Sequence, residues 1–402
     1  MRQHPGVSLF VRPILWTDFH AQMLGVQFTE TAPCKEPLPL NEPGSPPTKG
    51  HLRPSPTIMT LSDALSDILQ STIVHPVQVS TAARTVLSTL WPHAFRKPKF
   101  MPEMHIYYGG KIYRDAVRAQ LMWSYPDSPS SQTSFKSIST LAAGSNSLIS
   151  PISTPRPLAD PPTVCYIAKS QLANIRRNLF RIVPAPGRKW NEPVHRLQQL
   201  RSRALLPADT DRDAHLAGIF LAMAQRHFYP APSVVGRKPS QSSQKDLLEC
   251  PDFHDLTLRI LTHDTETAEF IVYTGHITAK FLERFHYPRK APREAGSDDV
   301  SGLNIEFTRV PIWPILGLKE RMGKALGEDV VGQIDLDTME TWNDEDIEPT
   351  SSNNTNKRKR EALSEVTNGS FDEESEADQP PSTPLGGKKR RLQQGPPLGV
   401  VA

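Results

Sequence analysis

A run of basic side chains between residues 164 and 203 is the part of this sequence best suited to bind a charged partner. It holds nine Lys and Arg residues against one acid, Glu192, and Tyr166, Phe180 and Trp190 are interleaved with them. Basic side chains neutralise phosphates and aromatic rings stack on bases, so this pattern is typical of a surface that binds nucleic acid. The residues that we expect to contact a partner are Arg176, Arg177, Arg181, Arg188, Lys189 and Trp190.

Two alternatives to nucleic-acid binding stay open for this region. Acids are frequent in 209–213 and 252–269, so the same bases could form ion pairs inside the fold. The basic surface could also bind an acidic protein. The sequence shows no signature of a known nucleic-acid-binding module, so charge alone does not distinguish DNA, RNA, a chromatin-associated protein and an internal pairing.

Two blocks of four bases flank an acidic stretch near the C-terminus. Each block fits the pattern of a nuclear import signal, which an import carrier binds through acidic and aromatic pockets. The sequence therefore predicts a nuclear location and an import carrier as partner. The residues of the two blocks are Lys357, Arg358, Lys359, Arg360, Lys388, Lys389, Arg390 and Arg391.

Thr383 stands five residues before the second block and precedes a proline. This pairing is typical of an acceptor for proline-directed kinases. A phosphate on Thr383 would add roughly −2 charge beside the basic block and weaken its binding. We therefore expect a phosphorylated, regulatory tail, although proline-rich sequences contain such pairs by composition alone.

Enzyme motifs are tested by their spacing. The stretch "GLKERMGKA" at 317–325 is similar to a phosphate-binding loop, but five residues separate its glycines and Ala325 occupies the place of the required Ser or Thr. The sequence contains no GxSxG elbow, no HExxH and no EF-hand loop. These observations favour a non-enzymatic protein, and no cofactor follows from them.

The order helix, strand, strand, helix, strand expected over the last part of the core resembles, in outline, the core of the PD-(D/E)xK nucleases. That resemblance implies a divalent metal held by carboxylates on neighbouring strands, and Asp264 and Glu269 are the residues that fit. The defining [Asp/Glu]-x-Lys motif is absent from the chain. A metal-dependent nuclease with a degenerate core is therefore the alternative, and it rests on an analogy of fold.

Histidines in the same region could hold a metal only if the strands brought them together. Nothing in their spacing requires this, because histidines at strand ends are usually hydrogen-bonded surface groups. We therefore predict no metal site from His254, His263, His276, Cys250 and Asp255.

Composition limits the kind of protein this can be. The chain has 402 residues, 39 of them proline, and 37% are hydrophobic, which indicates one core of moderate size joined to long linkers. Its three cysteines form no CxxC pair, so neither a disulfide framework nor a thiolate zinc module is expected. No apolar run approaches the roughly 20 residues that cross a bilayer, so no membrane is expected as a partner.

Proline, serine and charge runs divide the chain into five parts. We expect a mostly disordered segment at 1–58, the first part of the core at 59–125, a disordered insertion at 126–163, the main part of the core at 164–342 and a disordered tail at 343–402. The tail has a net charge of −3 and the preceding residues +6, so the folded part is the basic part.

Hydrophobic periodicity predicts an α+β fold, with helices around a small mixed sheet. Helices are expected at 61–74, 80–91, 172–181, 193–205, 210–228, 278–286 and 314–327, and a strand followed by a helix at 106–125. A hairpin is expected at 256–277 and a last strand at 302–312. The helix at 210–228 is apolar on most sides and should be buried.

Overall fold

The computed structural model describes residues 11–38, 55–70, 76–124, 162–181, 191–229, 250–289, 302–335, 339–340 and 342. All of them belong to one compact unit, Met1–Asp346. Within these residues no helix has the length and apolar character needed to span a bilayer.

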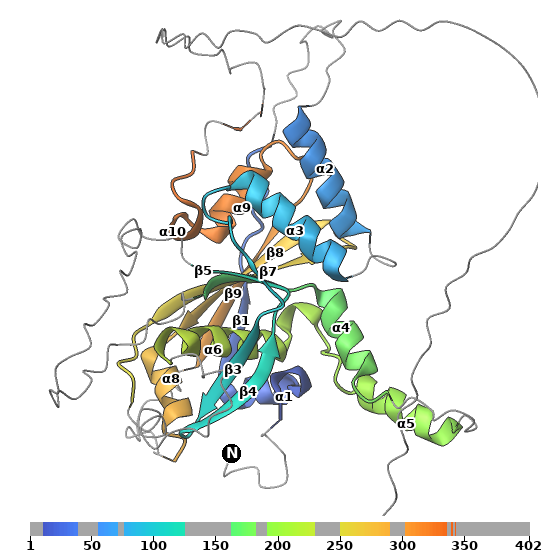
Figure 1. Ribbon diagram of the computed structural model, residues 1–402, viewed down its shortest axis with the longest axis vertical. Coiled ribbons are helices and arrows are strands. Elements are labelled where there is room, and N and C mark those ends of the chain that lie inside the picture. The colour runs from blue at the N-terminus through green and yellow to red at the C-terminus, as the bar shows by residue number, and fades with distance from the viewer. Residues whose placement is uncertain are drawn as a thin grey trace, which may run out of the picture. The chain divides into compact units, whose positions relative to one another are not determined.

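A mixed seven-stranded sheet forms the centre of this unit (Figure 1). The strand order is β1-β9-β8-β7-β6-β5-β2, with parallel pairing between β1 and β9 and between β6 and β7, and antiparallel pairing elsewhere. The fold is therefore α+β, as predicted. The strands are β1 (Val26–Glu30), β2 (Lys99–Phe100), β5 (Leu121–Ser124), β6 (Pro162–Tyr166), β7 (Leu256–Asp264), β8 (Glu269–Ile277) and β9 (Leu303–Pro311).

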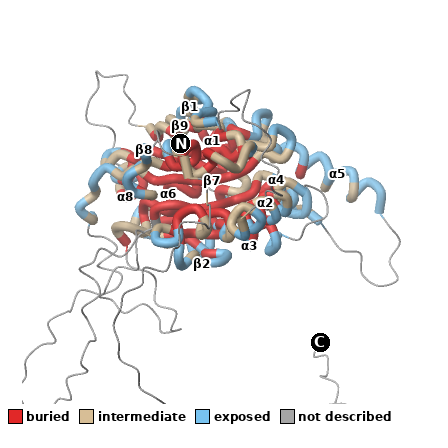
Figure 2. Tube along the Cα trace, turned by 90° about the horizontal axis from the view of Figure 1, so that it is seen from above, coloured by how far each residue is buried: buried red, intermediate tan, exposed pale blue. Residues whose placement is uncertain are grey.

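Helices cover both faces of the sheet and create two cores. One core packs the turn η1 (Pro13–Leu15) and the helices α1 (Asp18–Leu24), α6 (Ala214–Phe228) and α8 (Ala279–His286) on one face, with the hairpin β3 (Glu103–Tyr108) and β4 (Lys111–Arg118). The other core packs α2 (Pro56–Leu69), α3 (Pro76–Leu90), α9 (Leu318–Leu326) and α10 (Glu328–Val331). Figure 2 shows the buried residues concentrated in the sheet and in α6.

The central strands β7 and β8 explain why both faces must be covered. Ile260 and Tyr273 enter the first core, whereas the next residues along, Leu261 and Val272, enter the second. Successive side chains of a strand point to opposite faces, so a strand that is apolar throughout needs a cover on each side. The predicted hairpin is confirmed, with Asp264 opposite Glu269 at its closed end.

Helix α6 is the buried helix that the sequence predicts, with a different start. Asp213 is its N-cap, and the Asp213 side chain accepts a hydrogen bond from the backbone N–H of His215 at 2.8 Å. Thr210, predicted to begin the helix, lies in the preceding turn η3 (Thr210–Arg212). Gly218 permits close packing, because a Cβ there would lie 2.5 Å from Pro13.

The helix predicted within 106–125 is wrong, since this stretch forms β3, β4 and β5. Gly109 and Gly110 have φ values of 57° and 74° and connect β3 to β4. A two-residue turn of this kind requires left-handed backbone, which glycine adopts at little cost. The Gly-Gly pair was therefore the sequence signal for a hairpin.

The N-terminal part of the core was missed. Residues 1–58 were predicted to be mostly disordered, but 11–38 contribute η1, α1 and β1, and β1 pairs with β9 at an edge of the sheet. A five-residue strand gives little periodic signal, and tertiary pairing decides its conformation. The insertion predicted at 126–163 ends two residues too late, because Pro162 and Thr163 begin strand β6. Residues 126–161 and the tail from 343 lie outside the described residues.

Candidate interaction surface

The basic region 164–203 divides into a paired part and an exposed part. It contains β6, α4 (Lys169–Asn178) and α5 (Glu192–Arg203). Leu172, Ile175 and Leu179 recur at helical spacing along α4. The structure buries Leu172 and Arg176, which are one helical turn apart, and exposes Ile175 and Leu179.

Arg176 is held inside the fold and does not contact a partner, contrary to prediction. Its side chain is 1% exposed and forms a bidentate pair with Asp213, with Nη2 donating to Oδ1 at 2.7 Å. Its Nε donates to the carbonyl of Ile14 at 3.2 Å. A buried guanidinium needs a carboxylate that satisfies its donors, and the N-cap of α6 supplies one.

Six charged residues at one end of the sheet form a second internal network, which we call the ion cluster. Lys169 pairs with Asp211 and lies 3.6 Å from Asp264. Arg309, at the end of β9, pairs with Asp211 and donates to Glu269 at 3.1 Å. The members of the ion cluster are Glu30, Lys169, Asp211, Asp264, Glu269 and Arg309.

The ion cluster favours the charged form of Asp264. Burial alone would raise the pKa of Asp264, but the backbone N–H of Glu266 and the nearby Lys169 and Arg309 lower it below its ordinary value. Asp264 and Glu269, the pair that resembled a nuclease site, do lie together, and both face Arg309. Among the described residues no group of three His, Cys, Asp or Glu could hold a metal.

The histidines that might have bound a metal have separate surroundings. His263 is buried, and its Nδ1 lies 2.9 Å from the hydroxyl of Tyr166. Burial lowers the pKa of His263 to about 4, so the ring is neutral at pH 7. His276 lies 3.5 Å from Thr257, and Asp255 accepts from the N–H of Ala279.

The exposed side chains of the basic region lie on an arm made of α4, α5 and residues 179–181 and 204–206, which we call the α4–α5 arm. Figure 1 shows α5 extending away from the sheet, and Figure 2 shows it exposed along its length. The buried residue of α5 is Ser202, whose hydroxyl donates to the carbonyl of Arg177 at 3.2 Å. Tertiary packing therefore fixes one narrow face of this helix.

Local signals explain why α5 is helical with so little packing. The Asn191 side chain accepts from the N–H of Val194, and Pro193 lies in the first turn, where its missing N–H is not needed. Arg201 and Arg203 lie in the last turn, where cations suit the helix dipole. The predicted helix at 193–205 is confirmed.

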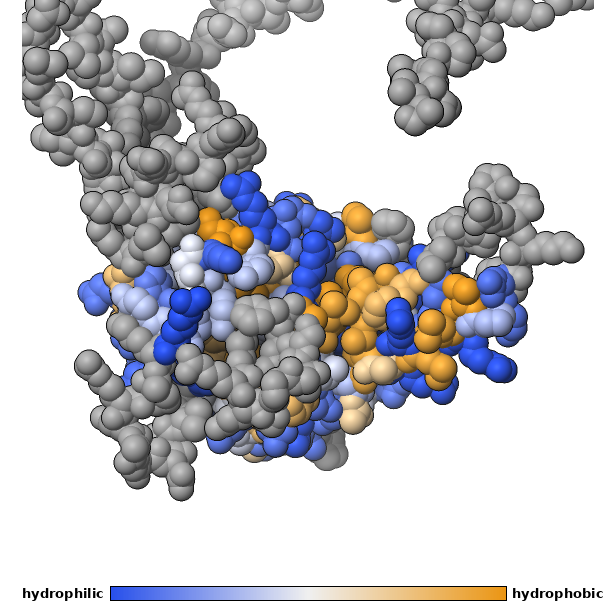
Figure 3. Space-filling view, turned by 90° about the horizontal axis from the view of Figure 1, so that it is seen from below, coloured by the Kyte–Doolittle hydropathy of each residue, from blue (hydrophilic) through white to orange (hydrophobic). Residues whose placement is uncertain are grey.

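Large apolar side chains are exposed on the arm among the arginines. Leu197 is 50% and Leu200 is 59% exposed. Figure 3 shows apolar side chains gathered on this side of the molecule, with hydrophilic side chains around them. Exposed apolar residues that cluster beside a polar rim mark interaction surfaces, whereas scattered ones do not. The apolar members on the arm are Ile175, Leu179, Val194, Leu197, Leu200 and Leu206.

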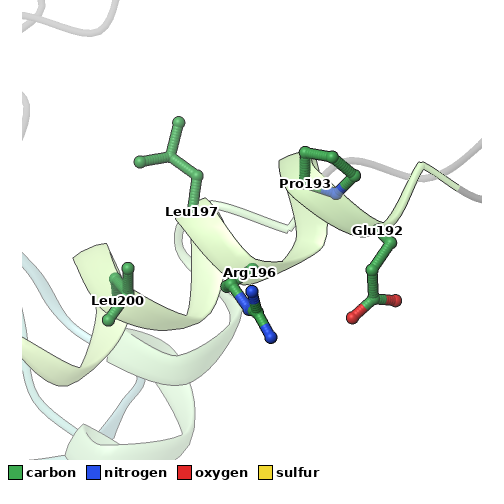
Figure 4. A pocket seen from close by; sticks show the side chains of 5 residues that line it. All are labelled: Glu192, Pro193, Arg196, Leu197 and Leu200. Carbon is green, nitrogen blue, oxygen red and sulfur yellow. The ribbon is translucent and has the colours of Figure 1, made fainter.

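A shallow and open hollow lies on the solvent side of α5. Its lining comes from that helix, and Figure 4 shows Leu197 and Pro193 on one side of the helix and Arg196 and Glu192 on the other. The lining residues are Glu192, Pro193, Arg196, Leu197 and Leu200.

Five arginines on the arm are exposed, and within the described residues none of them forms an ion pair. Arg177 and Arg181 were predicted as contact residues, whereas Arg196, Arg201 and Arg203 were counted in the basic region without a role. The signal missed was the recurrence of Pro193, Leu197, Leu200 and Ala204 along one face.

The other predicted site residues cannot be placed by the structure. Arg188, Lys189, Trp190 and Thr383 lie outside the described residues. So do both basic blocks, 357–360 and 388–391. No protein-family model and no curated protein matches this chain.

Proposed function

We propose that this protein is a non-enzymatic interaction protein of the nucleus that binds an anionic partner through the α4–α5 arm. One observation carries the proposal. Five exposed arginines share the arm with a single acid, Glu192, and with exposed leucines, whereas Lys169 and Arg176 are paired inside the fold. A surface with this excess of positive charge attracts phosphates or carboxylates.

The ion cluster gives the nuclease alternative little support. Metal-dependent hydrolysis needs carboxylate oxygens that are available to a cation. Asp264 and Glu269 instead face Arg309, and Lys169 lies beside Asp264. The ion pairs of the cluster therefore connect the ends of strands β8 and β9 to the turn η3.

The partner-binding proposal is tested by titrating the full chain into labelled duplex DNA, single-stranded RNA and polyglutamate over a salt series. The same samples, with and without Mg²⁺, are run on a denaturing gel. We expect salt-sensitive binding with intact strands. With DNA as ligand, Arg196→Ala/Arg201→Ala should lower the log-log salt slope by about 2.

Lys111→Ala/Arg114→Ala provides the matched control, because it removes two exposed charges from β4 and should leave affinity unchanged. Binding to none of the three polyanions at low salt would contradict the proposal. Strands cut only in the presence of Mg²⁺ would replace it with the nuclease.

The nuclear location is supported by the two basic blocks of the tail. A fluorescent fusion of the full chain should accumulate in the nucleus, and replacement of 357–360 and 388–391 by alanine should make it cytoplasmic. Nuclear accumulation that survives both replacements would contradict a role for the tail.

A further inference from the structure

Helix α5 carries the residue spacing of a coiled-coil seam on its exposed side. Pro193, Leu197, Leu200 and the C-cap residue Ala204 follow one another at intervals of four, three and four residues, and all four are exposed. This is the a/d pattern of a heptad, in which Leu197 takes position a and Leu200 position d. Ser202, the buried residue of the helix, then occupies position f, which lies opposite the seam. The seam therefore points away from the fold.

The residues that line the shallow hollow on α5 have the spacing at which a facing helix inserts a side chain. In knobs-into-holes packing, one side chain of a helix enters a diamond of four residues at i, i+3, i+4 and i+7 on the facing helix. Four of the residues that line the hollow have this spacing (Figure 4), namely Pro193, Arg196, Leu197 and Leu200.

The positions beside the seam determine which helix fits. Arg196 and Arg203 take g positions and Arg201 takes an e position, so arginines flank the leucines on both sides. Residues at e and g pair with the partner helix and set partner choice. A second copy of α5 would place arginines against arginines, whereas glutamates at those positions would form pairs.

We propose that the partner docked on the α4–α5 arm is an amphipathic α-helix with apolar residues at its a and d positions and acidic residues at e and g. This inference rests on the proposed function and specifies its partner. The leucines lie in the centre of the surface, between the arginines. A phosphate backbone would cover the arginines and leave the leucines in water, so a helix matches this arrangement better than nucleic acid does.

The probe is a fluorescein-labelled peptide of about 20 residues, long enough to form a partial helix, with leucine at a and d and glutamate at e and g. Fluorescence anisotropy of the full chain should show saturable binding with a micromolar dissociation constant. A scrambled peptide of equal composition, and a peptide with lysine at e and g, should each bind at least about tenfold more weakly.

Side-chain variants then locate the site. Leu197→Ala/Leu200→Ala should weaken peptide binding about tenfold or more, because both leucines are central to the seam. Leu38→Ala is the matched control, since Leu38 is an exposed leucine of similar accessibility outside the arm. Circular dichroism should show all variants folded. Equal affinity of the seam variant and the control would overturn the inference.

Parallel titrations separate this inference from the proposed function. Duplex DNA and vesicles of phosphatidylserine and phosphatidylcholine are compared with the peptide, and sedimentation tests self-association. Arm-dependent binding to DNA or vesicles, without preference for the acidic heptad peptide, would overturn the proposed helical partner and leave an anionic partner in place. Dimerisation that Leu197→Ala/Leu200→Ala abolishes would also overturn the proposed helical partner. Failure of the peptide, DNA, RNA and polyglutamate together would remove both proposals.

Discussion

The buried pair of Arg176 with Asp213 and the exposed arginines of α5 come from one continuous basic stretch, yet they have opposite surroundings. Arg176 is enclosed, and its donors are satisfied by Asp213 and the carbonyl of Ile14. The α5 arginines face solvent beside exposed leucines. Local charge density therefore does not identify a binding surface, because carboxylates inside the fold pair with some of the bases.

The largest expected effect is the loss of unfolding free energy when the buried Arg176–Asp213 pair is broken. Asp213→Ala leaves the Arg176 guanidinium buried without a counter-charge and removes the N-cap of α6, which should cost about 4 kcal/mol of unfolding free energy. Urea denaturation measures it. Glu103→Ala, which breaks the exposed pair with Arg118, should cost less than about 1 kcal/mol. Similar losses in the two variants would show that the buried pair is worth no more than the exposed one.

Acid should lower the unfolding free energy through the buried side chain of His263. Burial lowers the pKa of His263 to about 4, from an ordinary value near 6.5. The unfolded chain therefore binds more protons at His263 between these values, so the contribution of His263 to stability is constant above pH 6.5 and falls by roughly 3 kcal/mol as pH drops toward 4. In His263→Gln that part of the pH dependence should disappear. A variant with the same acid dependence as wild type would exclude this group as its source.

Salt should weaken partner binding to the α4–α5 arm and leave the stability of the fold, with its buried Arg176–Asp213 pair, nearly unchanged. Raising ionic strength from about 0.05 to 0.5 M shortens the screening length several-fold and should weaken binding to the arm by at least about tenfold. The midpoint of urea unfolding should change little, since the Arg176–Asp213 pair is shielded from solvent. Parallel anisotropy and unfolding titrations measure both. Salt-independent binding would indicate that the leucines act without the arginines.

Much of the fold could be predicted because its signals are local. The hairpin β7–β8, the buried helix α6 and the capped start of α5 each follow from a periodicity or a cap that lies within one stretch of sequence. Strand β1 was missed because its conformation depends on β9, which lies nearly 280 residues further along the chain. The sequence of a five-residue strand contains no signal of such a long-range pairing.

The candidate site was predictable in part for the same reason. The excess of bases located the right region, but Arg176 was assigned to a partner because its carboxylate, Asp213, lies 37 residues away in sequence. The heptad spacing of Leu197 and Leu200 was present in the sequence, but only their exposure shows that the fold leaves them uncovered. Sequence periodicity gives an apolar face without saying which element covers it.

The most direct test of the account is a charge exchange across the proposed helix pair. The full chain carrying Arg196→Glu/Arg201→Glu/Arg203→Glu is titrated with the acidic and the lysine-bearing heptad peptides, beside the wild-type chain. The account predicts that the preference reverses, with the variant binding the lysine peptide at least about tenfold more tightly than the acidic one. An unchanged preference, or the same low affinity of both chains for both peptides, would contradict it.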